Sequence, residues 1–391
     1  MAVSRNPVKD QVAIVGVGST GFLRASDRSA LALALEASTR AIRDAGLRAS
    51  DINGVVVPGE PGSPGPQLLV SSLGIPQVTH FSQPTPVAMF AFIDAINAIY
   101  SGTCDTVLVC VAMLRGPWSS RSAANDPFRR HMSASSAGAM PESMSMAAGY
   151  AAWAGRYVHE YGANREPFGR IAINGRTNAA DNPLAVMRDP ITMDDYLKAR
   201  MIREPLCMLD MDVPVDGADA FVLTSAERAK SLPHVPVLFH AATVGLVEHN
   251  DEDQLPSLAR HGQHVVVEAL RAKSDLWLDD VDVYMPYDGF SIITLGWIEN
   301  TGWCRPGEAS TFIAQHWDPV ANRIMINGRI PVNPHGGSLS EGATRGTGHM
   351  REAVVQLRGD ADARQVSGAK TALVTPGGFF FNSQGAILRV A

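Results

Sequence analysis

The sequence predicts a layered α/β fold built from two similar halves. Short apolar runs that are typical of buried strands alternate along the chain with longer segments of helical spacing. Such alternation is typical of parallel sheets covered by helices, so we expect a parallel sheet. The same order of elements occurs twice in the 391 residues. Apolar residues make up 46% and charged residues 18%, which suffices for a large core and is too apolar for a disordered chain.

The first half has the order strand, helix, strand, helix, strand. These elements are expected at residues 12–16, 29–44, 51–57, 87–100 and 106–112. Ser29 is the expected N-cap of the first helix, and Gly46 and Gly102 are expected to end the two helices. The last strand, TVLVCVA, is apolar along its whole length, which indicates a fully buried strand.

The second half repeats this order. Its elements are expected at residues 236–245, 262–273, 276–284, 350–357 and 371–375. The spacing from Leu276 to Asp280 also repeats that from Leu47 to Asp51. We interpret the repeat as an internal duplication, with chance similarity of two α/β halves as the alternative.

The predicted halves are residues 1–230 and 231–391, and a large insertion lies in the first half at about 115–203. Residues 121–138 of the insertion are rich in Ser, Ala and Arg and are expected to form a loop, whereas 141–161 and 168–180 have helical spacing. Insertions that follow strands of α/β sheets commonly build the substrate pocket.

Composition excludes several classes of function. The formal net charge, 33 minus 39, is −6, and no block of like charge invites nucleic acid or an anionic membrane. The longest apolar stretch, 87–100, has 14 residues, fewer than the roughly 20 of a membrane-spanning helix. The four cysteines form no C-x-x-C pair, so a structural zinc site is not expected. Without a secretory segment, the chain is expected in the cytoplasm with reduced thiols.

Residues 16–21, GVGSTG, match the pattern G-x-G-x-x-G after a strand. A dinucleotide fingerprint also requires a helix that begins at the last glycine and an acid at the tip of the second strand. Here residues 22–28 intervene, and the second strand leads into VPGE. The pattern favours a glycine-rich turn, with dinucleotide binding as the alternative.

Three segments carry a resemblance to a known family. They read REPLCMLDMDVPVDGADAFVL at 203–223, VDVYMPYDGFSIITLGWIENTGWCRPGE at 281–308 and VNPHGGSLSEGATRGTGHMREAVVQLR at 332–358. Together they resemble the thiolase superfamily, in particular its sterol-carrier-protein-type lipid-transfer branch. The resemblance spans nearly the whole chain and implies the thiolase fold, with two duplicated α/β halves stacked as layers, and a dimer.

Thiolases use a cysteine nucleophile, an activating histidine and a second cysteine, and this sequence departs from all three. The nucleophile position lies in PTPVA at 84–88, where Thr85 is the nearest hydroxyl. The family's G-H-P motif is replaced by GAT at 342–344, and the last cysteine region, TPGG at 375–378, has no cysteine. An acyl-enzyme is therefore not expected, and Cys104 and Cys110 are expected in the core.

Tyr287 and Asp288 remain as the principal candidates. The resemblance to steroid side-chain retro-aldolases implies that Tyr287 does acid/base work on a β-hydroxyacyl-CoA. A phenol with a pKa near 10 can exchange a proton with an alcohol when it is positioned and partly desolvated. The alternative is a core tyrosine hydrogen-bonded at a strand end. Those aldolases carry a second tyrosine at the position of Ala343, and its absence leaves open what replaces it.

Two glycine loops complete the candidate site. The NPHGG loop contributes His335 as a further acid/base group, and both loops offer backbone N–H groups to an oxyanion. The candidate donors are Asn333, Gly336, Gly337, Gly377 and Gly378. The alternative is that the glycines only permit sharp turns. Tyr287 and His335 are expected to face one cavity because both follow strands of one half. His349 is expected to be structural or at the surface.

The leading hypothesis is a retro-aldolase that cleaves a carbon–carbon bond in a β-hydroxyacyl-CoA with a bulky steroid or lipid acyl part. The alternatives are an acyltransferase of the superfamily and a non-catalytic subunit that binds acyl-CoA or lipid. Coenzyme A is expected as part of the substrate, with no tightly bound cofactor and no metal. The resemblance implies a homodimer and a small zinc-ribbon/OB-fold partner subunit.

Overall fold

The computed structural model describes residues 6–60, 62–115, 146–248, 257–379 and 382–391. Its centre is a nine-stranded sheet with the order β3-β2-β4-β7-β1-β8-β14-β13-β9. The strands are β1 (Val12–Leu23), β2 (Gly54–Val56), β3 (His80–Ser82), β4 (Thr106–Leu114), β7 (Asp216–Ser225), β8 (Val237–Gly245), β9 (Val283–Pro286), β13 (Thr371–Thr375) and β14 (Ser383–Val390). Two small sheets pair β5 (Met201–Arg203) with β6 (Leu206–Cys207), and β10 (Trp317–Asp318) and β12 (Ile330–Pro331) with β11 (Arg323–Ile326).

The strand pairing confirms the duplication. The parallel pair β2–β4 matches the parallel pair β9–β13. The antiparallel pairs β4–β7 and β7–β1 match β13–β14 and β14–β8. The two halves meet where β1 pairs with β8, Ala13 opposite Leu238 and Ile14 opposite Val237.

The expectation of a parallel sheet is wrong at the centre, where all five strand pairs from β4 to β13 are antiparallel. The connection between β13 and β14 is short, and a short connection can only join antiparallel neighbours. Parallel pairing is confined to the flanks, where helices cross over between the strands.

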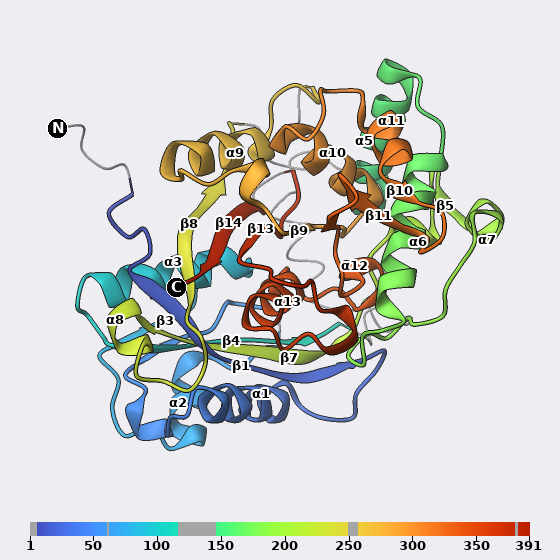
Figure 1. The fold of residues 1–391 in the computed structure, drawn as a ribbon. Helices are drawn as coiled ribbons and strands as arrows, with labels where there is room; N and C mark the ends of the chain where they lie inside the picture. The colour runs from blue at the N-terminus through green and yellow to red at the C-terminus, as the bar shows by residue number, and fades with distance from the viewer. Residues whose placement is uncertain (1–5, 61, 116–145, 249–256, 380–381) are drawn as a thin grey trace.

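Helices cover the sheet in layers. They are α1 (Ala30–Asp44), α2 (Pro66–Leu73), α3 (Ala88–Tyr100), α5 (Met146–Tyr161), α6 (Glu166–Ala179), α7 (Met193–Lys198), α8 (Ala226–Ala229), α9 (Gly262–Lys273), α10 (Ser291–Thr301), α11 (Ala309–Gln315), α12 (Gly337–Ser340) and α13 (Thr347–Arg358). In Figure 1, α1 and α2 lie outside the first half of the sheet, α3 and α13 lie between the halves, and α9 and α10 lie outside the second half. Three hydrophobic clusters fill these layers, and the central cluster joins side chains of both halves, such as Phe92 and Met350.

Gly16 and Gly18 lie inside β1 and not in a turn. A Cβ atom on Gly16 would stand 2.2 Å from the carbonyl oxygen of Ala41, and one on Gly18 would stand 2.2 Å from that of Ala37. These glycines therefore let α1 pack closely against the strand. Neither the expected turn nor a dinucleotide-binding loop is present, because the segment pairs with β7 as a strand.

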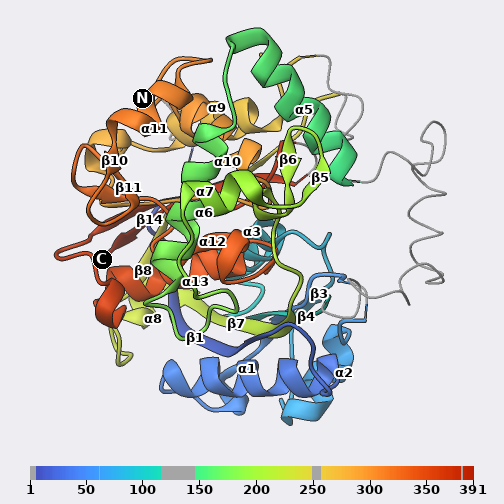
Figure 2. The same ribbon diagram turned by 90° about the vertical axis from the view of Figure 1, so that its right-hand side faces the viewer.

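The insertion enters the described part of the chain with α5, α6 and α7. The predicted helices at 141–161 and 168–180 correspond to α5 and α6, although residues 141–145 lie outside the described residues. The predicted loop at 121–138 lies outside them too. Figure 2 shows α6 running beside α12, so the insertion packs against the second half of the chain.

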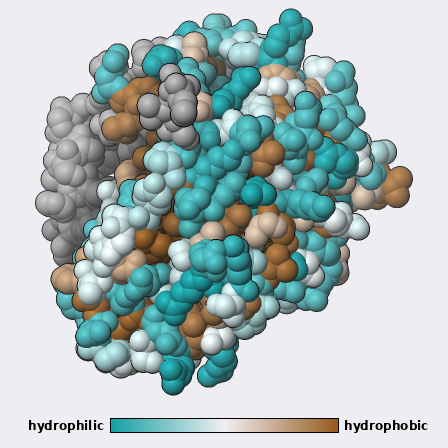
Figure 3. All heavy atoms as spheres, turned by 60° about the vertical axis from the view of Figure 1, so that its left-hand side comes forward, coloured by the Kyte–Doolittle hydropathy of each residue, from teal (hydrophilic) through white to brown (hydrophobic). Residues whose placement is uncertain are grey.

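The surface is mixed in character. On the face drawn in Figure 3, apolar areas are separated by polar ones. No helix among the described residues has the length and apolar character needed to cross a membrane.

Candidate active site

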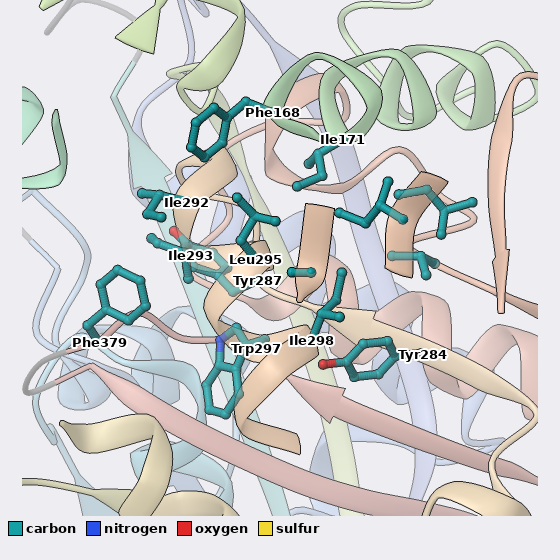
Figure 4. Close-up of a cluster of buried hydrophobic side chains, with 14 of the residues drawn as sticks. Phe168, Ile171, Tyr284, Tyr287, Ile292, Ile293, Leu295, Trp297, Ile298 and Phe379 are labelled. Carbon is teal, nitrogen blue, oxygen red and sulfur yellow. The ribbon is translucent and has the colours of Figure 1, made fainter. Parts of the chain in front are cut away.

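Tyr287 follows β9 and is held on several sides. Its backbone N–H donates to the carbonyl of Thr375 at 2.9 Å, and its carbonyl accepts from the Thr294 hydroxyl at 3.2 Å. Figure 4 shows its ring among the apolar side chains of α10. The side chain is nearly buried, with 8% exposure. These contacts hold the backbone and the ring in place. The hydroxyl is the one polar group of the side chain.

The Asp212 carboxylate adjoins the Tyr287 hydroxyl and is the charged group that acts on it most strongly. Asp212 lies in the segment between the 3-10 helix η4 (Met208–Asp210) and β7. Arg115, which follows β4, places its Nη1 atom 3.9 Å from Asp212 Oδ2 and donates to the carbonyl of Ala343 at 3.4 Å. The side chains of Arg115 and Asp212 are 17% and 19% exposed, so this cluster reaches solvent although Tyr287 is nearly buried.

A second guanidinium stands beside this cluster. Arg345 has a left-handed backbone, with φ of 57°, in the loop between α12 and α13. It forms an ion pair with the buried carboxylate of Glu60, which follows β2. Its positive charge acts on both Tyr287 and Asp212. Four separate segments of the chain thus supply the charges around the tyrosine.

Burial and charge set the proton affinities of the pair. Burial raises the pKa of Tyr287 above that of a free phenol, and the negative charge of Asp212 raises it further. Burial likewise raises the pKa of Asp212, while Arg115 and Arg345 oppose that rise. The phenol therefore keeps its proton at neutral pH, and Asp212 is a stronger base than an ordinary carboxylate.

Asp288 faces the interior. Its carboxylate accepts from the backbone N–H groups of Ser338 at 2.7 Å and Leu339 at 3.3 Å, at the start of α12. It also contacts His349 Nε2 at 3.2 Å. Asp288 and His349 are both buried, so this pair orients the loop that follows Tyr287. The expected structural role of His349 fits this position, whereas a place at the surface does not.

His335 is completely buried, and neither ring nitrogen has a hydrogen-bond partner among the described residues. Its ring lies 4.7 Å from that of His349, which lies 5.7 Å from the Tyr287 ring. His349 therefore stands between the two expected partners, and the expected shared cavity is not what the structure shows. Burial, and then the neighbouring His349, lower the pKa of His335 well below its ordinary value, so the ring is neutral.

The loop N–H groups are mostly occupied. Those of Asn333, Gly336 and Gly377 donate to the carbonyls of Tyr284, Asn333 and Thr375 at 3.0, 2.9 and 2.9 Å. Three of the expected oxyanion donors therefore already donate to backbone carbonyls, because the tight turns need those hydrogen bonds.

The two other loop glycines differ from each other. Gly337 adjoins the Asp288 carboxylate, so close that a Cβ atom would stand 1.9 Å from its Oδ2. The negative charge of Asp288 beside Gly337 would repel an oxyanion there. Gly378 lies beside the side chains of Asn382 and Tyr150 and remains a candidate donor.

The cysteines do not belong to the cluster. Burial raises the pKa of Cys104 and Cys207 to about 11 and that of Cys110 and Cys304 to about 12. Thiolates are therefore strongly disfavoured, and Cys104 and Cys110 lie in the core as predicted. Ala343 is also buried. Among the described residues, no three His, Cys, Asp or Glu side chains are grouped as metal ligands.

Comparison with known proteins identifies the family of this chain. A family model described as Thiolase C-terminal domain-like matches residues 245–389. The chain is 35% identical to a steroid side-chain-cleaving aldolase of Thermomonospora curvata, over 93% of this chain and 94% of that one. The chain belongs to the thiolase superfamily.

Two further proteins are similar to this chain over almost its whole length. A 17-hydroxy-3-oxo-4-pregnene-20-carboxyl-CoA lyase of Mycobacterium tuberculosis is also 35% identical, over 94% of this chain and 96% of its own. The solved structure of an Ltp2-ChsH2(DUF35) aldolase superposes with a TM-score of 0.87 at 33% identity, and 98% of each chain is covered.

Sequence analysis did not single out Asp212, Arg115 or Arg345. Asp212 lies in a segment that carries the thiolase resemblance, where its position between two other acids, Asp210 and Asp216, hid it. Arg115 directly follows a fully apolar strand, and a charge at such a strand end is a signal that could have been used. Arg345 carried no such signal, because its position depends on the left-handed turn.

Proposed function

We propose that this member of the thiolase superfamily is a retro-aldolase that cleaves a carbon–carbon bond in a β-hydroxyacyl-CoA with a bulky steroid or lipid acyl part. The observation that carries the proposal is the position of the Tyr287 hydroxyl beside the Asp212 carboxylate and the charges of two arginines. None of the four cysteines, all of which are described, belongs to this group. The names of the 35% identical relatives, an aldolase and a CoA lyase, support the substrate class.

Retro-aldol cleavage needs no acyl-enzyme. A base takes the β-hydroxyl proton, the carbon–carbon bond breaks, and the resulting thioester enolate must be stabilised. Tyr287 is the proposed acid/base group. The charges of Arg115 and Arg345 and the N–H of Gly378 are the proposed stabilisers. Asp288 and His335 are proposed to hold the loops in place and not to contact the substrate.

The partner assignments are part of the proposal. Coenzyme A belongs to the substrate, and no other cofactor is invoked. A homodimer through the edge of the first half is supported by β3, which pairs on one side only among the described strands and exposes 53% of Phe81. The two-component name of the Ltp2-ChsH2(DUF35) aldolase supports a small partner subunit, for which the zinc-ribbon/OB type is the proposed kind.

Two further assignments stay proposals. A cytoplasmic location is supported by four cysteines that form no disulfide. The proposed division of the chain is 1–230 and 231–391, with the insertion at about 115–203. It is supported by the matching strand order of the two halves.

The test is turnover. The purified chain, alone and with its small partner, is incubated with a β-hydroxyacyl-CoA that carries a bulky acyl part, and products are identified by mass spectrometry. We expect a free carbonyl product and a shortened acyl-CoA. Acyl transfer to a second thioester would favour the acyltransferase, and binding without turnover would favour the non-catalytic subunit. As a control, replacing all four cysteines by serine should keep turnover within about tenfold.

A further inference from the structure

The following inference rests on the proposed function. In a retro-aldol reaction one proton leaves the β-hydroxyl and one proton arrives at the α-carbon, so a group must hold a proton while the bond breaks. Tyr287 cannot do this alone, because a phenol that already carries its proton has no room for a second one. The tyrosine needs a neighbour that accepts its proton and later returns it.

Asp212 is the carboxylate that acts most strongly on that hydroxyl. Its backbone N–H donates to the carbonyl of Gly289 at 2.9 Å, two residues after Tyr287. The next residue, Val213, donates to the carbonyl of Ser338 at 3.1 Å. The first bond ties the backbone of Asp212 to the turn that carries the tyrosine, and the second ties the next residue to α12. Its side chain is 19% exposed, so it adjoins solvent.

The charges around Asp212 come from several elements. Arg115 and Arg345 face it with positive charge, and Asp288 faces it with negative charge. Arg345 is itself paired with Glu60. Burial and Asp288 raise the pKa of Asp212 and the two cations oppose that rise, so this carboxylate accepts a proton more readily than an ordinary one.

We propose that Asp212 stores the proton during carbon–carbon bond cleavage. The Tyr287 oxygen takes the β-hydroxyl proton while its own proton passes to the Asp212 carboxylate. The O–H electron pair forms the C=O bond of the released carbonyl product, and the electron pair of the broken bond goes to the α-carbon and forms the thioester enolate. The stored proton then returns through the Tyr287 oxygen to the α-carbon. Both side chains end in their starting states, and no co-reactant is consumed.

The kinetic test compares Asp212→Asn with the wild type on the β-hydroxyacyl-CoA substrate. We expect kcat to fall by about 10²–10⁴-fold with little change in KM. The acidic limb of the kcat pH profile should lie above pH about 4, the ordinary carboxylate range, and should vanish in the variant. Asp194→Asn, which alters an exposed carboxylate 73% open to solvent, is the matched control and should keep wild-type activity.

A double variant sharpens the test. Asp212→Asn combined with Tyr287→Phe should lose no more activity than Tyr287→Phe alone, because the two groups act on one proton. Activity within tenfold in Asp212→Asn, or an unchanged acidic limb, would overturn the proposal, since a merely structural carboxylate would leave the pH profile in place.

A spectroscopic titration separates this proposal from the proposed function. Tyrosinate absorbance is followed against pH in Asp212→Asn and in the double variant. Removing the negative charge of Asp212 should let one additional tyrosine ionise at lower pH, and that tyrosine should be missing from the double variant. If the wild type lacks lyase activity, the proposed function fails whatever the titration shows. If lyase activity is present and the titration does not change, the proton-store role alone fails.

Discussion

Tyr287 and His335 are both polar rings in glycine-containing loops that follow strands of the second half, yet their surroundings differ. The charges of one carboxylate and two guanidinium groups, all of them on partly exposed side chains, act on the Tyr287 hydroxyl. The His335 ring is sealed in the interior with no hydrogen-bond partner for either nitrogen among the described residues. A reactive group needs charged neighbours, and of these two rings Tyr287 is the one whose charged neighbours reach solvent.

The largest expected effect is on Tyr287. Tyr287→Phe keeps the ring packing and removes only the oxygen, so we expect kcat to fall by about 10²–10⁴-fold, which is about 3–5 kcal/mol of barrier. Steady-state kinetics with a β-hydroxyacyl-CoA, together with thermal unfolding, measures both. A Phe variant with near-normal kcat would remove the contrast between the two loops.

The next largest effect is expected on stability, at the buried ion pairs of Arg351. Arg351 is buried between Asp219, at 2.7 and 2.9 Å, and Glu341. Arg351→Met would leave two buried carboxylates without a cation, so we expect the free energy of unfolding to fall by about 3–5 kcal/mol. Urea unfolding measures this loss.

The matched control is Arg156→Met, which breaks an exposed ion pair on α5 and should cost less than about 1 kcal/mol. Equal losses of unfolding free energy in the two variants would mean that the buried ion pairs stabilise the fold no more than the exposed one.

A smaller effect is expected where the insertion holds the NPHGG loop. Asn178 on α6 donates to the carbonyls of Val332 at 3.0 Å and Asn333 at 3.1 Å. Asn178→Ala would leave the Asn333 carbonyl short of this bond, whereas Asn174 still donates to Val332. We expect a loss of about 1–3 kcal/mol in unfolding, measured in urea, and kcat within tenfold of the wild type. A large fall in kcat with unchanged stability would instead draw this loop into the chemistry.

The smallest effect concerns the pH dependence of stability. The pKa of His335 is lowered in the folded state, so the unfolded chain binds more protons as the pH falls below about 6.5. Stability contributed by the neutral ring is therefore present above that pH and is lost on acidification, by up to about 1.4 kcal/mol per pH unit. His335→Leu should flatten this part of the stability curve, measured by urea unfolding from pH 7 to 5, and keep kcat within tenfold. An unchanged slope would mean that His335 accepts a proton in the folded state.

Much of the fold follows from local patterns. Ser29 caps α1 as expected, α9 spans residues 262–273 as predicted, and β13 spans 371–375 as predicted. Apolar periodicity and capping residues report which face of a segment is buried and where it ends, and these properties depend on near neighbours in the chain. Repetition of that order along the chain was enough to predict the duplication.

Local patterns in the sequence predict many of the elements, the duplicated architecture and Tyr287 as a candidate, but they miss β7 and β14 at the centre of the sheet. Three features appear only in the folded chain: the antiparallel pairing at the centre of the sheet, the burial of His335, and the position of Asp212 beside Tyr287. Tyr287 and Asp212 are 75 positions apart in the sequence and lie in the two different proposed halves of the chain. Their contact depends on strand order and loop conformation across the whole sheet, which no local pattern encodes.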